Sequence, residues 1–253
     1  MTLLFLIILK TRKLNNDYTD FPLEIWKISG TLVLEILRIS KGKKDYTDYM
    51  KIDHKKLRED ALSKAVSILR NGGIIALPTE TVYGLVGDFF SEDAVRKIYE
   101  IKGRDFSKPL SIFVYDIQSV VLYVEKLPDF AYKLMRAFCP GPLTVVLKKK
   151  IGLDVPLKTD TLGFRIPDHC VPLGLLKEYG PLVSTSANLS GGKDALNAEE
   201  VREYFDGKID LVLDGGQTIL QMPSTVIDCT GHSPKIVREG KISKEDIERI
   251  INT

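Results

Sequence analysis

The stretch IIALPTETVYGL, residues 74–85, joins an apolar run to a cluster of hydrogen-bonding side chains. The run IIAL predicts a short buried strand, since consecutive apolar residues suit a strand that is covered on both faces. Pro78 ends the run, and four side chains with oxygen atoms follow: Thr79, Glu80, Thr81 and Tyr83. Ligands bind at the carboxyl ends of strands in open α/β sheets, so this stretch is expected to line a binding site. The pattern does not assign separate roles to Glu80 and Tyr83.

Helical and strand patterns alternate around this stretch. Helical spacing of apolar residues predicts a helix within residues 50–73, with Asp53 as its cap and Gly72-Gly73 as its end. Further helices are predicted at residues 91–103, 128–138, 172–179, 198–205 and 243–250. Further strands are predicted at residues 110–115, 144–147, 162–166, 182–186, 211–213, 225–228 and 235–238. The alternation predicts a mixed α/β fold, in which helices cover a sheet.

The composition is that of an ordinary globular domain. The 253 residues are 44% hydrophobic and 28% charged, with a net charge of +2, which argues against disorder and a multispan membrane protein. No global charge attracts nucleic acid or anionic lipid, so any basic site is local. The cysteines stand singly at positions 139, 170 and 229, which favours reduced thiols and a cytoplasmic location over disulfides or a zinc site.

Residues 1–49 differ from the rest of the chain. Their apolar run at residues 3–9 is too short to span a bilayer and lacks the basic start of a signal peptide. We expect either a small appendage or an upstream over-extension of the reading frame, with Met50 as the true start. Residues 50–253 contain no linker-like stretch and are predicted to form one domain.

Two further segments carry candidate ligand contacts. KGRDFSKPL, residues 102–110, holds three cations close together: Lys102, Arg104 and Lys108. Clustered cations favour an anion such as phosphate, and the alternative is a solvated helix end. Arg165 lies inside an apolar strand pattern and needs a carboxylate or phosphate partner, which a structural salt bridge would also supply.

A third segment, LVSTSANLSGG at residues 182–192, passes from a strand into hydroxyl, amide and glycine residues. These groups suit a phosphate or a ribose, and the alternative is a merely polar loop. Ser224 and Arg238 are weaker candidates near the C-terminal end of the chain. The sequence has no Walker loop, no G-x-G-x-x-G and no H-E-x-x-H, so any nucleotide would bind without these standard motifs.

Taken in order, these segments resemble the YrdC-like family of threonylcarbamoyl-AMP synthases. The resemblance covers residues 52–251 and rests on seven motifs: PTETVYGL (78–85), K-x-R…KPL (102–110), PGPLT (140–144), FRIP (164–167), S-x-S-A-N-x-S-G (184–191), PSTV (223–226) and R-x-G (238–240).

The resemblance implies a single domain with a twisted open mixed sheet, flanking helices and a concave basic cavity. Residues 50–253 would be this catalytic domain, in the family's short, single-domain form. The implied reaction condenses L-threonine, bicarbonate and ATP into threonylcarbamoyl-AMP and pyrophosphate, a nucleotidyltransferase step in the N6-threonylcarbamoyladenosine modification of tRNA. Mg²⁺ is expected to arrive with ATP, and other proteins would transfer the product to tRNA.

The resemblance also implies roles for individual residues. Threonine would contact four of them: Thr81, Arg165, Ser184 and Ser224. ATP would contact seven: Lys102, Arg104, Lys108, Thr161, Ser186, Asn188 and Arg238. Lys102 and Arg104 would also be catalytic, because they neutralise phosphate charge in the transition state.

Two rival functions stand beside the synthase. One is an RNA-binding module of the same fold without ATP turnover, although aromatic residues are not interleaved with the cations as binders of single strands usually require. The other is a carbamoyltransferase-like relative from hydrogenase maturation, whose cysteine-rich zinc modules the sequence lacks. Direct contact with tRNA stays open in either case, and no membrane partner is expected.

Overall fold

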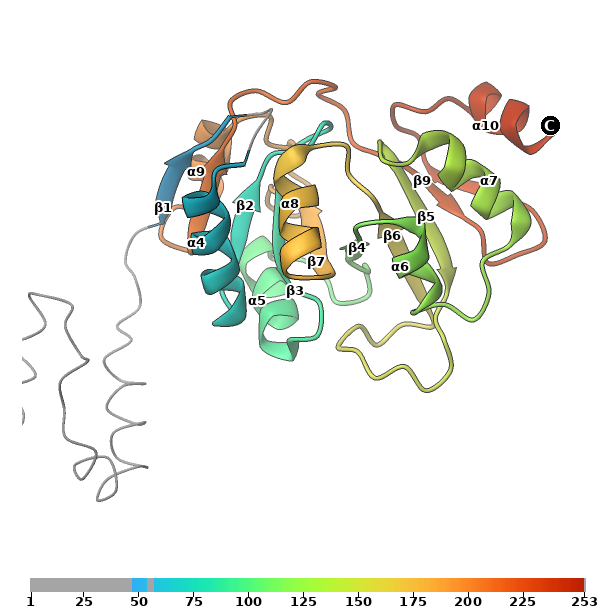
Figure 1. The fold of residues 1–253 in the computed structure, drawn as a ribbon, viewed down its shortest axis with the longest axis horizontal. Coiled ribbons are helices and arrows are strands. Elements are labelled where there is room, and N and C mark those ends of the chain that lie inside the picture. The colour runs from blue at the N-terminus through green and yellow to red at the C-terminus, as the bar shows by residue number, and fades with distance from the viewer. Residues whose placement is uncertain (1–46, 54–56, 253) are drawn as a thin grey trace, which may run out of the picture. The chain divides into compact units, whose positions relative to one another are not determined.

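The computed structural model describes residues 47–53 and 57–252, in which ten strands form one mixed sheet (Figure 1). In chain order the strands are β1 Asp48–Lys51, β2 Ile75–Leu77, β3 Gly84–Asp88, β4 Ser111–Phe113, β5 Leu143–Lys148, β6 Thr161–Arg165, β7 Leu182–Ser186, β8 Leu211–Asp214, β9 Thr225–Asp228 and β10 Lys235–Arg238. Their order across the sheet is β1-β8-β2-β3-β7-β4-β6-β5-β9-β10. The sheet contains both parallel pairs, such as β4 with β6, and antiparallel pairs, such as β3 with β7. The predicted mixed α/β class is confirmed.

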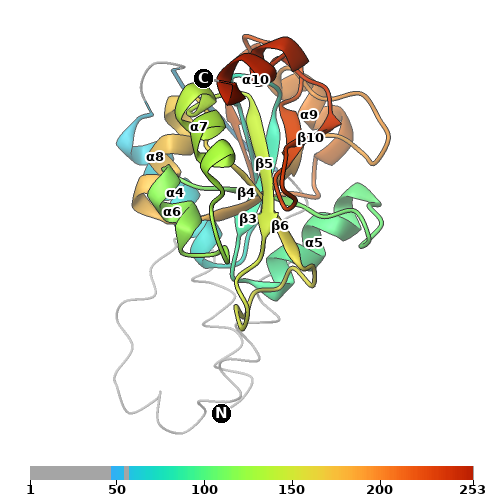
Figure 2. The same cartoon turned by 90° about the vertical axis from the view of Figure 1, so that its right-hand side faces the viewer.

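Helices cover both faces of this sheet. They are α4 Glu59–Arg70, α5 Glu92–Lys102, α6 Ile117–Val121, α7 Asp129–Phe138, α8 Cys170–Glu178, α9 Ala198–Phe205 and α10 Lys244–Ile251. In Figure 2, α4 and α8 lie on one side of the central strands, and α5 and α9 lie on the other. Neighbouring residues of β2 enter different cores: Ile75 joins the cluster with α4 and α8, and Ala76 joins the cluster with α5 and α9.

The N-terminal end of the predicted first helix is wrong. Residues 48–51 form β1, which pairs in parallel with β8, and the helix begins only at Glu59. Asp53 therefore does not cap it; Arg58 precedes the first turn and makes no side-chain capping bond. The local helical pattern is overridden here by pairing with a strand about 160 residues away, which a local pattern does not reveal.

Two other elements were not predicted from the sequence. Residues 84–88 form β3, which pairs with β2 and β7 on either side. The short helix α6 follows Asp116, whose carboxylate accepts a hydrogen bond from the Ser119 amide at 2.8 Å. The other predicted strands and helices agree within about two residues, the usual margin at element ends.

The predicted extension, residues 1–49, falls almost entirely outside the described residues, so this boundary stays a prediction. Strand β1 straddles its end at residue 50. Within the described part of the chain, no helix combines the length and the apolar character that crossing a membrane requires.

Candidate active site

One half of the sheet has a covered face and a half-exposed face. A row of residues across β4, β6, β5 and β9 is fully buried against the helices: Ile112, Phe164, Val145 and Ile227. The neighbouring row points to the opposite face and is only partly buried: Ser111, Gly163, Val146 and Asp228. We call this second row the open face. Residues two positions along a strand share a face, so Thr161 and Arg165 lie on the same side as Gly163.

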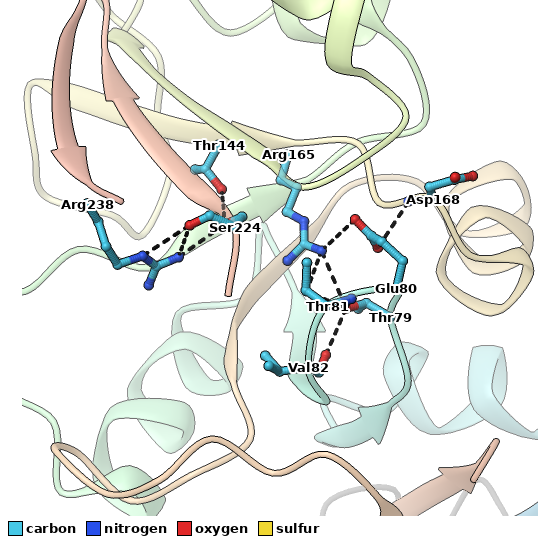
Figure 3. A network of polar contacts seen from close by, with 9 residues as sticks. All are labelled: Thr79, Glu80, Thr81, Val82, Thr144, Arg165, Asp168, Ser224 and Arg238. Carbon is cyan, nitrogen blue, oxygen red and sulfur yellow. Dashed lines mark hydrogen bonds and ion pairs between the residues drawn. The ribbon is translucent and has the colours of Figure 1, made fainter. Parts of the chain in front are cut away.

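Arg165 is held against the turn that follows β2 (Figure 3). Its Nη2 donates to Glu80 Oε1 at 2.9 Å, to Thr81 Oγ1 at 2.6 Å and, at 3.4 Å, to Thr79 Oγ1. The side chains of Arg165 and Glu80 are only 8% and 7% exposed, so water does little to screen this ion pair. Among the described residues the buried Nε of Arg165 has no hydrogen-bond partner. The guanidinium therefore keeps a donor for a further acceptor.

Glu80 and Tyr83 connect the same turn to two other segments, one at residue 168 and one in the loop between β8 and β9. Glu80 Oε2 accepts a hydrogen bond from the Asp168 amide at 3.2 Å, and the Glu80 carbonyl accepts one from the Leu220 amide at 2.8 Å. The Tyr83 hydroxyl donates to the Gly216 carbonyl at 2.9 Å and accepts from the amide of residue 215 at 3.0 Å. Burial raises the pKa of Tyr83, so the phenol stays protonated. Both residues therefore stabilise the turn through hydrogen bonds to neighbouring segments.

Ser224 and Arg238 form a second group beside Arg165 (Figure 3). Ser224 Oγ lies 2.8 Å from Thr144 Oγ1, and Arg238 Nη2 donates to Ser224 Oγ at 3.1 Å and to its carbonyl at 2.8 Å. Burial lowers the pKa of Arg238; the charges of Arg165 and Arg104 lower it further, while Asp194 opposes them. These guanidinium groups are thus close enough to repel one another, and a bound anion would relieve that repulsion.

Lys102 is the most buried of the predicted phosphate ligands, at 2% exposure. Its Nζ donates to the carbonyls of Ser186 and Asn188 and, at 3.0 Å, to Asn188 Oδ1. Burial, with a smaller effect of Arg104, lowers the pKa of Lys102 to about 8. All three ammonium protons have protein acceptors, so Lys102 fixes the segment after β7 in this structure. Contact with a phosphate would require one of these bonds to open.

The remaining predicted residues surround these groups at different depths. Arg104 donates to the carbonyls of Lys108 and Pro109, each at 3.1 Å, which closes the loop between α5 and β4. Lys108 itself is exposed, and Thr161 lies at the opposite end of β6 from Arg165. Ser184 is 1% exposed, and within the described residues its Oγ has no partner.

The structure brings together three of the predicted groups: Thr81 with Arg165, Ser224 with Arg238, and Lys102 with Ser186 and Asn188. Sequence reasoning missed the contacts of Thr79 and Thr144. Thr79 lies in the PTETVYGL motif and Thr144 in the PGPLT motif. The motifs therefore located the two segments but did not show which of their side chains make contacts. In the described ranges no three His, Cys, Asp or Glu side chains gather as metal ligands would.

Comparison with known proteins gives consistent results. A family model of the Sua5, YciO and YrdC proteins, described as telomere recombination, matches residues 67–240. Threonylcarbamoyl-AMP synthase of Bacillus subtilis (strain 168) is 39% identical over 203 residues, which are 79% of this chain and 59% of that protein. The putative threonylcarbamoyl-AMP synthase of Methanocaldococcus jannaschii is 37% identical over 197 residues, which are 76% of this chain and 94% of the relative.

A solved structure is also similar to this chain in fold. The crystal structure of P. abyssi Sua5 complexed with L-threonine superposes with a TM-score of 0.77 at 36% identity, over 81% of this chain and 61% of that one. The chain thus spans about three-fifths of the length of the two longer relatives, at 59% and 61%.

Proposed function

Because the chain belongs to the Sua5, YciO and YrdC family, we propose that it is a threonylcarbamoyl-AMP synthase. In this proposal it condenses L-threonine, bicarbonate and ATP into threonylcarbamoyl-AMP and pyrophosphate, and it is a nucleotidyltransferase by reaction class. The B. subtilis relative carries the synthase name, and P. abyssi Sua5 was crystallised with L-threonine.

The observation that carries the proposal is the Nε of Arg165, which has no hydrogen-bond partner in the part of the chain that the structure describes. A buried donor without an acceptor costs about 1–3 kcal/mol, which a carboxylate bound at that edge of the guanidinium would recover. The hydroxyls of Thr79 and Thr81 stand beside it, within hydrogen-bond distance of Nη2. Threonine offers the carboxylate that Arg165 lacks, whereas the two hydroxyls already bond to each other at 2.8 Å and Thr79 donates to the Val82 carbonyl at 2.7 Å.

The chemistry follows from which groups of threonine are engaged. With its carboxylate held by Arg165, the amine is the free nucleophile, and its reaction with bicarbonate gives a carbamate and water. A carbamate oxygen then attacks the α-phosphorus of ATP, and pyrophosphate leaves. Lys102, Arg104 and Arg238 would stabilise the negative charge of the phosphates in the transition state. Correct positioning of the two substrates would supply most of the remaining rate enhancement. No protein nucleophile is required.

Magnesium would come to the site bound to ATP. The predicted phosphate contacts are cations, which repel a free divalent ion but tolerate one that is neutralised by phosphate oxygens. We assign no protein ligands to it.

The wider setting is proposed from the same family membership. The product would pass to other proteins that transfer the threonylcarbamoyl group to tRNA, and the reaction would take place in the cytoplasm. Direct binding of tRNA by this chain remains an alternative that the cation cluster alone does not favour over ATP.

The test is release of pyrophosphate by the purified chain. With all three substrates we expect steady release, and omission of threonine or of bicarbonate should abolish it. Release that depends on neither would mean an unrelated ATPase. Binding of RNA without any release would favour the RNA-binding alternative.

A further inference from the structure

The residue at the centre of the open face, Gly163, has no side chain. Gly163 lies in the middle of β6, between Ser111 of β4 and Val146 of β5, and it is partly exposed although strands flank it on both sides. The residues on either side of it along β6, Leu162 and Phe164, are 1% and 0% exposed on the covered face. The exposure of Gly163 therefore belongs to the open face.

A Cβ atom at this position would cause no steric clash with the protein. A Cβ built on Gly163 would meet only the Cγ2 of Thr144 at 3.5 Å, the Cγ2 of Val146 at 3.7 Å and the Oγ of Ser111 at 4.0 Å. These are ordinary van der Waals distances, and the backbone of Gly163 is not in the left-handed region. Neither backbone conformation nor protein packing requires glycine here, so the fold itself would accept a larger residue at this position.

Gly163 also separates the two ends of the proposed site. On the same face of β6, Thr161 stands two residues before it and Arg165 two residues after it. At about 3.3 Å per residue, the Cα atoms of Thr161 and Arg165 are about 13 Å apart. If Arg165 holds the threonine carboxylate and Thr161 contacts the nucleotide, the atoms that react must meet between them.

We propose that the carbamate oxygen approaches the α-phosphorus directly over Gly163, and that the absence of a side chain at this position leaves space for the two reacting groups. The inference rests on the proposed function, and it assigns Gly163 as a positioning residue. Because reacting atoms must come within about 3–3.5 Å of each other, one added methyl group under them is enough to misalign the pair. Each substrate alone, bound toward one end of β6, would be little affected.

The test compares Gly163→Ala with the wild-type chain in three measurements. Calorimetric titration gives the affinity for L-threonine alone and for ATP alone, and pyrophosphate release gives the turnover. We expect both affinities to be unchanged within error and turnover to fall on the order of 100-fold. A merely structural role for Gly163 would instead lower the melting temperature together with both affinities.

Gly231→Ala is the matched control, because Gly231 is exposed and an added Cβ would meet only the Ser233 carbonyl at 3.9 Å. It should keep wild-type turnover. If Gly163→Ala does not fold, Val146→Ile places one extra carbon on the open face beside Gly163 and should give the same loss of turnover with retained binding.

The possible results distinguish failure of the role of Gly163 from failure of the proposed function. Wild-type turnover in Gly163→Ala, or loss of threonine or ATP binding in a folded Gly163→Ala, overturns this inference and leaves the proposed function intact. A wild-type chain that releases no pyrophosphate with all three substrates overturns the proposed function and this inference together.

Discussion

At the scale of single residues, Arg165 combines a structural partner with a free donor. Its need for an acidic partner follows from the apolar residues on either side of it in the sequence. The identity of that partner does not, because Glu80 is 85 residues away and meets Arg165 only when β2 and β6 join one sheet. The salt bridge proposed as the alternative to ligand binding is present, but it leaves one guanidinium donor over, because Nε has no partner among the described residues.

We predict that Arg165→Ala chiefly weakens the use of threonine. Loss of a buried, charge-assisted carboxylate contact should be worth roughly 2–5 kcal/mol in threonine affinity, with a much smaller effect on ATP. Titration with each substrate measures both. Arg96→Ala is a suitable control, because that arginine is 60% exposed and its ion pair lies on the surface. Equal losses for threonine and ATP would contradict the role of Arg165.

Lys102 gives a pH dependence with a defined sign. Its pKa is lowered to about 8, so the ammonium is charged below that pH and neutral above it. If it neutralises phosphate, kcat/KM for ATP should fall as the pH rises through about 8, since that ratio reports on the free enzyme. Lys102→Arg stays charged over the whole range and should lack this decline. A flat wild-type profile between pH 7 and 9.5 would speak against a phosphate role for Lys102.

At the scale of elements, local patterns identified most of the fold but not the strands that depend on distant partners. The strands at residues 182–186, 225–228 and 235–238 carry β-branched residues and clear boundaries, and all three are confirmed. Strand β3 contains two glycines, which argue for a turn. It forms because β2 and β7 offer backbone partners on both sides, and tertiary pairing outweighs local propensity.

The packing of α5 on β3 explains one of those glycines. A Cβ on Gly87 would lie 2.8 Å from Ile74 Cδ1 and 3.2 Å from Ala94 Cβ, both closer than side chains normally approach. We expect Gly87→Ala to lower the free energy of unfolding by about 1–3 kcal/mol through overpacking. The urea midpoint measures this change, and Gly231→Ala should leave the midpoint in place. An unchanged midpoint for Gly87→Ala would show that α5 can shift at no cost.

At the scale of the whole molecule, the two halves of the sheet differ in how far their faces are buried. Around β2 and β3 both faces are buried, as Ile75 and Ala76 show at 0% exposure each, and this half supplies stability. Around β6 one face stays partly exposed. The polar turn after β2 reaches Arg165 at one end of this strand, whereas Ser186 at the end of β7 lies toward its other end, at Thr161. Sequence motifs located these polar segments, whereas the open face emerges only from the order of the strands, which motifs do not contain.

The central claim is that Arg165 holds the threonine carboxylate so that the carbamate, and not the carboxylate, is joined to AMP. Mass spectrometry of the adenylate formed with ¹³C-bicarbonate tests it most directly. We predict a product that contains threonine, AMP and one carbon from bicarbonate. An adenylate that contains threonine but no labelled carbon would mean that the carboxylate itself was activated, and it would contradict both the proposed reaction and the role of Arg165.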